Sequence, residues 1–198
     1  GADLCEHLRT LIYISNPTSR RSTGTKITNR VLHVLPHRLL GSCNASMTAP
    51  IPVVVAGALG RMGAEVIRAV TGAADCTLVG AIDNTPGKEG MDVGLELGLE
   101  ELTVAVTADF EGCLCAVSQS VRDAGKAAVL VDFTHPSVVY EHTRAAIAYG
   151  VHPVIGTTGL TPQQLQDLSV FSAKASIGGA VIPNFSVGMV LLQQAAAA

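Results

Sequence analysis

The sequence has few aromatic residues, no long apolar run, no excess of basic charge and no paired cysteine pattern. Phe, Tyr and Trp together make up 4% of its 198 residues, and Trp is absent. No apolar run approaches the roughly 18–20 residues of a membrane-spanning helix, so we expect no membrane span. The formal net charge of −3 gives no sign of the excess of basic residues that binding to nucleic acid requires. Five cysteines without a secreted disulfide framework indicate reduced thiols in a reducing compartment.

The remaining composition is that of a globular α/β protein, but the chain divides into two unlike parts. Apolar residues make up 48% and charged residues 15%, which suits one domain with a substantial core. Residues 1–46 carry six Lys and Arg against two acids, whereas residues 47–198 carry seven against fourteen. We therefore expect residues 1–46 to be a disordered leader. It is either a transit peptide or translated upstream sequence, since the first methionine is Met47.

We expect no metal site. His33 and His37 have helical spacing, but Pro36 interrupts the helix that would place them on one face. Cys113 and Cys115 have no second cysteine pair with which to complete a zinc site.

The most informative stretch is a β-branched strand, residues 51–56, that runs directly into Gly57, Gly60 and Gly63. Such a turn from strand to helix is typical of pyrophosphate binding. Gly57 permits the tight turn, Gly60 lets the backbone approach the phosphates, and Gly63 lets the helix pack close to the sheet. The free amides of the helix's first turn then face the anion. Leu59 occupies the middle position of the usual Gly-x-Gly-x-x-Gly form, so the triplet alone is a weak signal.

An acid at the right distance strengthens this prediction. The residues after the glycines have the apolar spacing of a helix that ends at Gly72, and residues 77–82 predict a second strand that ends in Asp83. In a βαβ unit this places a carboxylate at the tip of the second strand, where it can accept hydrogen bonds from the adenine-ribose hydroxyls of a dinucleotide. The alternative is an exposed loop acid before Asn84.

The rest of the chain alternates strands and helices, which predicts a doubly wound parallel α/β sheet of the Rossmann type. Ligands bind such sheets at the carboxyl edge, where four glycine-rich or polar segments arrive, although each one alone is compatible with ordinary turn chemistry. These segments are residues 57–63, 133–136, 156–159 and 184–186. After a loop at 83–98, the further expected strands are 103–107, 127–134, 151–155 and 180–182, of which 127–134 is an apolar run that ends in polar residues. The expected helices are 110–122, Pro136 to Gly150, and one to Lys174 that begins with the capping box Thr161-Pro-Gln-Gln164.

Four blocks occur in order along the chain: Val55-Ala-Gly-Ala-Leu-Gly-Arg-Met-Gly63, Val131-Asp-Phe-Thr-His-Pro136, Val154-Ile-Gly-Thr-Thr-Gly159 and Pro183-Asn-Phe-Ser-Val-Gly188. In order and approximate spacing they resemble the 4-hydroxy-tetrahydrodipicolinate reductase family, formerly called dihydrodipicolinate reductase. The resemblance covers about residues 51–194, and the sequence of residues 47–194 resembles cyanobacterial members. Four blocks in order are far more specific than a glycine triplet.

The resemblance implies an enzyme of the diaminopimelate route to lysine. In that family NADH or NADPH delivers hydride to C4 of a cyclic 4-hydroxy imino diacid, a small-molecule substrate, as water is lost. The family also implies a homotetramer in the bacterial cytoplasm, or in the plastid stroma if residues 1–46 are a transit peptide. We expect a dinucleotide-binding domain at 47–186 and the start of a hinge helix at 187–198. The second, α+β domain for substrate binding and tetramerisation is expected beyond Ala198, so the chain as given is expected to be inactive.

The resemblance also assigns site residues. The pyrophosphate would be held by Gly57, Ala58, Leu59, Gly60, Arg61 and Met62, and the adenine ribose by Asp83. Phe133 and Thr134 would lie beside the dinucleotide. Its nicotinamide end would be lined by Gly156, Thr157 and Thr158, with Thr158 also near the substrate carboxylate. The site would be closed by Ile182, Pro183, Asn184 and Phe185. No catalytic residue is assigned, and His135, His142 and His152 are expected to be packing or surface histidines.

Two alternatives and the choice of cofactor stay open at this point. Another Rossmann-type amino-acid dehydrogenase would share the first domain, although the block that begins at Pro183 argues against it. A dinucleotide-binding module without chemistry of its own is the second alternative. Asp83 favours NADH over NADPH, because a carboxylate repels a 2′-phosphate and the next residue, Asn84, supplies no cation. Lys88 is close enough in sequence to bind that phosphate.

Overall fold

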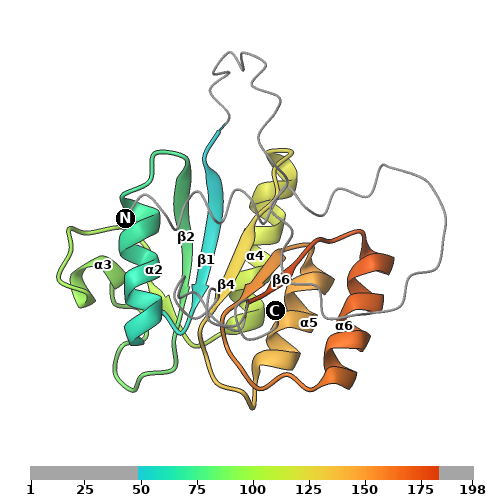
Figure 1. Ribbon diagram of the computed structural model, residues 1–198. Helices are drawn as coiled ribbons and strands as arrows, with labels where there is room; N and C mark the ends of the chain where they lie inside the picture. Colours follow the sequence, from blue (N-terminus) through green and yellow to red (C-terminus); the bar gives the residue numbers. More distant parts are fainter. Residues whose placement is uncertain (1–48, 183–198) are drawn as a thin grey trace, which may run out of the picture.

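The computed structural model describes residues 49–182, which form a six-stranded parallel sheet flanked by helices (Figure 1). The strands lie in the order β3-β2-β1-β4-β5-β6. The predicted doubly wound α/β fold is therefore confirmed. The expectations for residues 1–46 and 187–198 lie outside the described residues. The strand bounds are Ile51–Ala56 for β1, Cys76–Ile82 for β2, Val106–Thr107 for β3, Val129–Asp132 for β4, His152–Ile155 for β5 and Ala180–Val181 for β6.

The strand order reverses between β1 and β4, which are neighbours in the sheet. From β1 the chain moves outward to β2 and β3, then returns to β4 and moves outward in the other direction to β5 and β6. The carboxyl ends of the central strands are level, since Ala56 pairs with both Ile82 and Asp132, and Asp132 also pairs with Ile155. In sheets of this kind the ligand crevice lies outside the carboxyl ends at the reversal.

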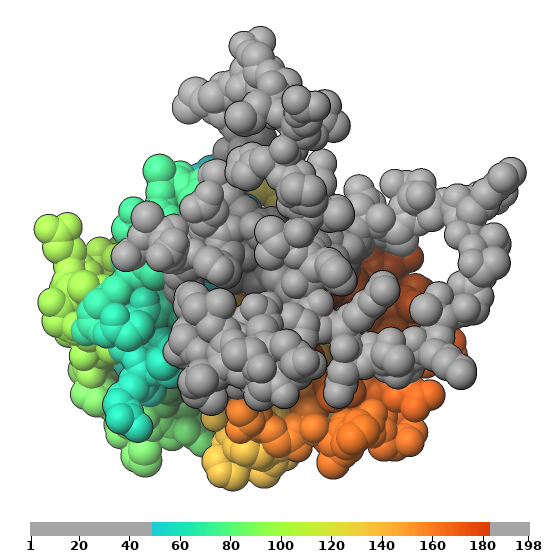
Figure 2. All heavy atoms as spheres, viewed as in Figure 1, coloured from blue at the N-terminus to red at the C-terminus, as the bar shows by residue number. Residues whose placement is uncertain are grey.

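Helices cover both faces of the sheet, and alternate strand residues face two separate hydrophobic clusters. Val53 and Val55 of β1 belong to the cluster with α2 and α3, whereas Val54 and Ala56 belong to the cluster with α4 and α5. Figure 1 shows α2 and α3 on the left, and α5 and α6 on the right, and in the same view of Figure 2 the cyan to green residues lie on the left and the orange to red residues on the right. The helix bounds are Arg61–Thr71 for α2, Val93–Glu96 for α3, Phe110–Asp123 for α4, Val139–Tyr149 for α5 and Pro162–Ala175 for α6.

The start of α6 confirms the capping box that the sequence predicts. The Thr161 hydroxyl oxygen accepts the Gln164 amide at 3.2 Å, and the Gln164 side-chain oxygen accepts the Thr161 amide at 2.9 Å. Pro162 occupies the first helical position, where its missing N–H leaves no bond unmade. Among the residues described, no helix has the length and apolar character needed to span a membrane.

The start of α5 differs from the prediction. The pattern predicts a helix that begins with Pro136, but α5 begins at Val139. Pro136 lies in the preceding turn, where the His135 carbonyl oxygen accepts the amides of Val138 and Val139. A proline supplies the φ value that both a turn and a first helical turn need, so its presence does not distinguish the two.

The predicted strand at 103–107 is only partly present, because β3 is two residues long. Thr103 has a φ of 55°, in the left-handed region that a strand does not adopt. The carboxylate of Asp92, which caps α3, also accepts the amides of Leu102 and Val104, each at 3.1 Å. These amides therefore bind a side chain instead of a neighbouring strand.

Candidate functional site

The glycine turn after β1 has the close backbone contacts that the sequence predicts. Gly57 has a φ of 76°, and a Cβ there would lie 2.5 Å from the carbonyl oxygen of Phe133. A Cβ on Gly63 would lie 1.9 Å from the Gly57 carbonyl oxygen. Both glycines are therefore required by packing, the first for the turn against β4 and the second for the approach of α2 to the sheet.

The amides of this turn are largely used inside the protein. Gly57 and Ala58 both donate to the Ile82 carbonyl oxygen, at 2.9 and 3.1 Å, and Gly60 donates to the Gly57 carbonyl oxygen at 3.1 Å. The Ala58 side chain is fully buried. The donors that remain belong to the first turn of α2, at 61–63, because the first amides of an α-helix have no partner within it.

The start of α2 fits an anion. Its N-cap residue, Gly60, provides no side-chain cap, and the first turn contains no acid. Within residues 49–182, a Cβ on Gly60 would meet only the Gly57 carbonyl oxygen, at 3.2 Å, so no other part of this range fills the space in front of the helix. Arg61 and Met62 are exposed beside it. A helix N-terminus without a side-chain cap, without an acid in its first turn and with an adjacent cation favours a phosphate group.

Asp83 lies directly against the glycine turn. Its Oδ2 accepts the Leu59 amide at 2.8 Å, and its Oδ1 accepts the Thr85 amide at 2.9 Å and the Thr85 hydroxyl at 2.6 Å. The carboxylate is therefore held at the tip of β2, beside the start of α2, and is not a loose loop acid. Lys88 forms a 2.5 Å ion pair with Glu96, so the nearest cation in the sequence already has a partner.

Phe133, in the segment that follows β4, contacts the segments that follow β1 and β5. Its amide donates to the Ala56 carbonyl oxygen at 3.0 Å, next to the glycine turn. A Cβ on Gly156 would lie 2.2 Å from the Phe133 ring, so the ring rests on the backbone of Gly156. The segments that follow β1, β4 and β5 are therefore in contact at one edge of the sheet, as the sequence predicts.

A buried polar cluster, which the sequence does not predict, lies beneath these segments and is centred on Asp132, the last residue of β4. Asp132 is fully buried. Its Oδ1 accepts the Thr134 amide at 2.9 Å, the Thr134 hydroxyl at 2.7 Å and the Thr157 hydroxyl at 2.7 Å. Its Oδ2 lies 3.0 Å from His142 Nδ1. Burial alone raises the pKa of Asp132, but hydrogen bonds from His142, Thr134 and Thr157 outweigh it and hold that pKa below its ordinary value.

His142 is a packing histidine, as expected, and it also belongs to this cluster. Its ring stacks on Phe110 of α4, with centroids 3.9 Å apart and an interplanar angle of 9°. An ionised carboxylate only accepts hydrogen bonds, so Nδ1 of His142 carries a hydrogen and donates it in the bond to Asp132. His135 Nδ1 lies 2.9 Å from the Ser137 hydroxyl, and His152 Nδ1 lies 3.0 Å from the Gly178 carbonyl oxygen, in line with structural roles.

The remaining predicted site residues differ in accessibility. Thr157 is buried and its hydroxyl is bound to Asp132, whereas Thr158 is exposed at the sheet edge. Ile182 is half-buried, and its amide donates to the Ile155 carbonyl oxygen at 2.8 Å. The other three closing residues, Pro183, Asn184 and Phe185, lie outside the described residues.

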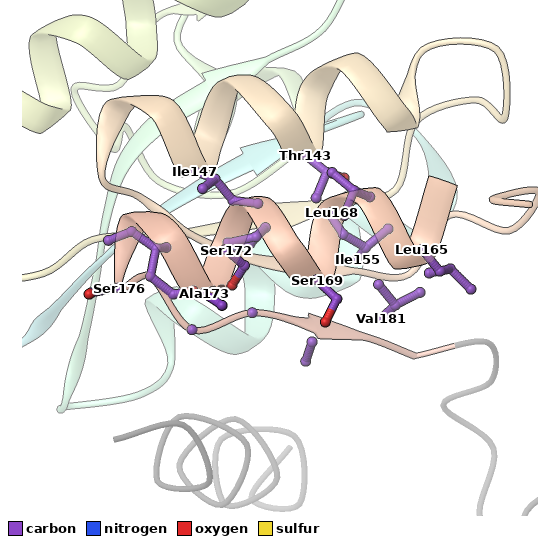
Figure 3. Close-up of a pocket in the computed structure, with 15 residues that line it drawn as sticks. Thr143, Ile147, Ile155, Leu165, Leu168, Ser169, Ser172, Ala173, Ser176 and Val181 are labelled. Carbon is purple, nitrogen blue, oxygen red and sulfur yellow. Dashed lines mark hydrogen bonds between the residues drawn. The ribbon is translucent and has the colours of Figure 1, made fainter. Parts of the chain in front are cut away.

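A groove of about 470 Å³ lies elsewhere, between α5, α6 and the strands β5 and β6 (Figure 3). It is lined mainly by apolar side chains, among them Ile147, Leu165 and Leu168. Among residues 49–182, its lining contains no titratable side chain and none of the predicted site residues of that range. The strand-edge segments, and not this groove, therefore form the candidate site for a charged ligand.

The part of the chain that the structure describes offers no metal centre. Within residues 49–182 no group of three or more His, Cys, Asp or Glu side chains could hold a metal ion. His33 and His37 lie outside this range. Burial, with a smaller effect of Asp109, raises the pKa of the Cys113 thiol, so it is a poor nucleophile.

Comparison with known proteins gives a consistent result. Residues 51–185 match the family described as dihydrodipicolinate reductase, N-terminus. The 4-hydroxy-tetrahydrodipicolinate reductase of Synechococcus sp. (strain CC9605) is 90% identical over 152 residues, which cover 77% of this chain and 55% of that protein. Its counterpart in Prochlorococcus marinus (strain MIT 9313) is 76% identical over 150 residues, covering 75% of this chain and 53% of that protein. The chain thus spans about half the length of these curated relatives.

Solved structures show the same similarity. A dipicolinate-bound dihydrodipicolinate reductase from Paenisporosarcina sp. TG-14 matches with a TM-score of 0.59 and 30% identity. The match covers 74% of this chain and 52% of that chain. A dehydrogenase from Thermus thermophilus in complex with NAD and alpha-ketoglutarate has a TM-score of 0.58 at 16% identity, covering 74% of this chain and 46% of that one. At that identity the second likeness concerns the fold alone.

Proposed function

Because the chain belongs to the dihydrodipicolinate reductase family, we propose that residues 51–185 form the dinucleotide-binding half of a 4-hydroxy-tetrahydrodipicolinate reductase. The cofactor is NADH or NADPH, which when bound supplies the hydride that reduces C4 of the cyclic imino diacid. The family match disfavours the alternative of an unrelated amino-acid dehydrogenase.

The hydrogen bond between Asp83 and the Leu59 amide carries this proposal. It brings the acid at the tip of β2 to the glycine turn and the uncapped start of α2. A dinucleotide needs this combination, because the pyrophosphate uses the helix N-terminus while the acid accepts the adenine-ribose hydroxyls. In this arrangement Gly60, Arg61 and Met62 hold the pyrophosphate, and Ala58 and Leu59 shape the turn.

The segments after β4 and β5 then bind the other half of the cofactor. A dinucleotide crosses the crevice where the strand order reverses, so its nicotinamide half lies over β4 and β5. Phe133, Thr134 and Gly156 line this part, and the exposed Thr158 also reaches the substrate carboxylate. Ile182 and the three residues after it close the site.

The other properties of the whole enzyme are proposed from its relatives. The groups that transfer the proton and bind most of the substrate belong to the part of the relatives that lies beyond the matched segment. The full-length enzyme is a homotetramer of the bacterial cytoplasm. We assign no catalytic role to His135, His142 or His152, because each has a structural partner.

A chimera tests the proposal. Residues 51–185 replace the matching segment of the full-length Synechococcus sp. (strain CC9605) reductase, and reduction of the cyclic imino diacid is measured with NADH and NADPH. We expect activity close to that of the parent enzyme. The matched control carries Gly60→Ala in the same chimera and should lose most of its activity while remaining folded. A folded chimera without activity would contradict the proposal and would favour a dinucleotide-binding module without chemistry.

A further inference from the structure

The buried carboxylate of Asp132 joins two strand-end segments just beyond the last paired residues of β4 and β5, Asp132 and Ile155. It binds Thr134, which follows β4, and Thr157, which follows β5. We propose that Asp132 and His142 are positioning residues, which hold these two segments at the separation that the nicotinamide half of the cofactor needs. This inference rests on the proposed function and adds two residues that do not touch the cofactor.

Packing alone does not account for an acid at this position. Asp132 follows Leu130 by two residues in β4, so its side chain faces the cluster with α4 and α5 that contains Leu130. A buried carboxylate is costly unless it is fully hydrogen-bonded, and an apolar residue would pack there without that cost. The carboxylate of Asp132 instead has four hydrogen bonds, three of them from residues of the strand-end segments.

The two carboxylate oxygens of Asp132 have different partners. Oδ1 accepts both threonine hydroxyls at 2.7 Å, which sets the distance between the two segments. Oδ2 faces His142, whose ring stacks on Phe110 and therefore anchors the carboxylate to α5 and α4. The Thr157 amide also donates to the Asp132 carbonyl oxygen, at 3.2 Å, so backbone and side chain hold the same loop.

The position of this cluster predicts a selective effect. Asp83 and the glycine turn lie at the β1 and β2 ends, where the adenine half binds, whereas the Asp132 cluster lies under the β4 and β5 ends. A change in the cluster should therefore weaken binding of the whole dinucleotide and leave binding of its adenine half unchanged. A general loss of structure would weaken both.

The test compares NADH with ADP-ribose, which lacks the nicotinamide. Dissociation constants are measured by calorimetric titration of the full chain at a temperature at which far-UV circular dichroism shows every variant to be folded. Thr157→Val removes the hydroxyl that Oδ1 accepts, and His142→Phe keeps an aromatic ring against Phe110 but removes Nδ1. The rescue variant is Thr157→Ser. The matched control is Thr143→Val, since the Thr143 hydroxyl is equally buried but donates to the Val139 carbonyl oxygen within α5.

We expect Thr157→Val and His142→Phe to weaken NADH about tenfold, the loss typical of one hydrogen bond to a charged group, with ADP-ribose changed less than about twofold. Thr157→Ser and Thr143→Val should bind both ligands like the unchanged chain. Equal losses for NADH and ADP-ribose, or no loss for either, would overturn the positioning role and leave the proposed function intact. If the unchanged chain bound neither ligand, the proposed function itself would fail, and this inference with it.

Discussion

Two alanine substitutions only three residues apart should separate folding from cofactor binding. Gly63→Ala places a Cβ 1.9 Å from the Gly57 carbonyl oxygen, whereas real Cβ contacts stay above 3.0 Å. The start of α2 must therefore retreat by about 1 Å from a backbone atom that cannot rotate away. Gly60→Ala places a Cβ 3.2 Å from that same oxygen and meets no other atom of residues 49–182, so the turn accepts it with a small adjustment.

The magnitudes decide the outcome for each variant. Overpacking costs about 1–3 kcal/mol, and this contact with a backbone atom falls in the upper part of that range, at about 2–3 kcal/mol. The helix propensity of alanine returns about 1 kcal/mol, so Gly63→Ala should lose roughly 1–2 kcal/mol of unfolding free energy. This corresponds to a fall in Tm of roughly 2–8 °C. For Gly60→Ala the weaker N-cap and the reduced freedom of the unfolded chain offset each other, to within about 0.5 kcal/mol. Its methyl group, however, occupies the space before the helix, so NADH should bind at least about tenfold more weakly.

The assay measures thermal unfolding by circular dichroism and NADH binding by titration, both on the full chain. Gly72→Ala is the control, because Gly72 ends the same helix with a φ of −80°, which alanine adopts without strain. A Gly60→Ala variant that binds NADH like the unchanged chain would refute the assignment of the pyrophosphate to this turn. A Gly63→Ala variant with unchanged Tm would refute the packing argument.

Three further predictions concern single side chains. Asp83→Ala should weaken NADH about tenfold or more and NADPH less, because the repulsion of the 2′-phosphate is also lost; equal losses in titrations with both cofactors would show that Asp83 does not bind the ribose. The folded pKa of Asp132 lies below its unfolded value of about 3.9, so its stabilisation is complete above that pH and is lost as the pH falls through the folded pKa. Urea unfolding from pH 7 down to 2.5 should therefore show a steeper acid loss for the unchanged chain than for Asp132→Asn, and parallel curves would contradict this. Thr161→Ala removes the cap of α6 and should lower Tm by roughly 2–5 °C, for about 1 kcal/mol, whereas Thr161→Ser should match the unchanged chain.

Elements determined by residues close in sequence are predicted well from the sequence. The β-branched run of β1, the glycines that follow it and the helix that ends at Gly72 depend on neighbours within a few turns. The place of Asp83 at the tip of β2 also follows from the sequence, because a βαβ unit has a standard geometry, whereas its contact with the Leu59 amide is seen only in the structure. Its hydrogen bond to the ribose stays a prediction, as do the roles of 183–185.

The errors arise where distant residues decide the local structure. The strand expected at 103–107 is shortened because Asp92 takes the amides of Leu102 and Val104. The Asp132 cluster combines the ends of two strands with a helix whose start the pattern places three residues too early, at Pro136. One signal was available, since Asp132 shares a strand face with Leu130 and a buried acid requires partners.

The reversal of strand order also has a consequence for how the molecule folds. Within the described sheet, the halves β3-β2-β1 and β4-β5-β6 meet along one pairing, in which Val53 lies opposite Val129. Pairs such as β1 with β2 join neighbouring segments of the chain, whereas β1 with β4 closes a long loop, so we expect this seam to form late. A dinucleotide that lies across the seam binds only after the halves have joined. It should therefore slow unfolding, by contacts that the folding transition state lacks, and leave the folding rate almost unchanged.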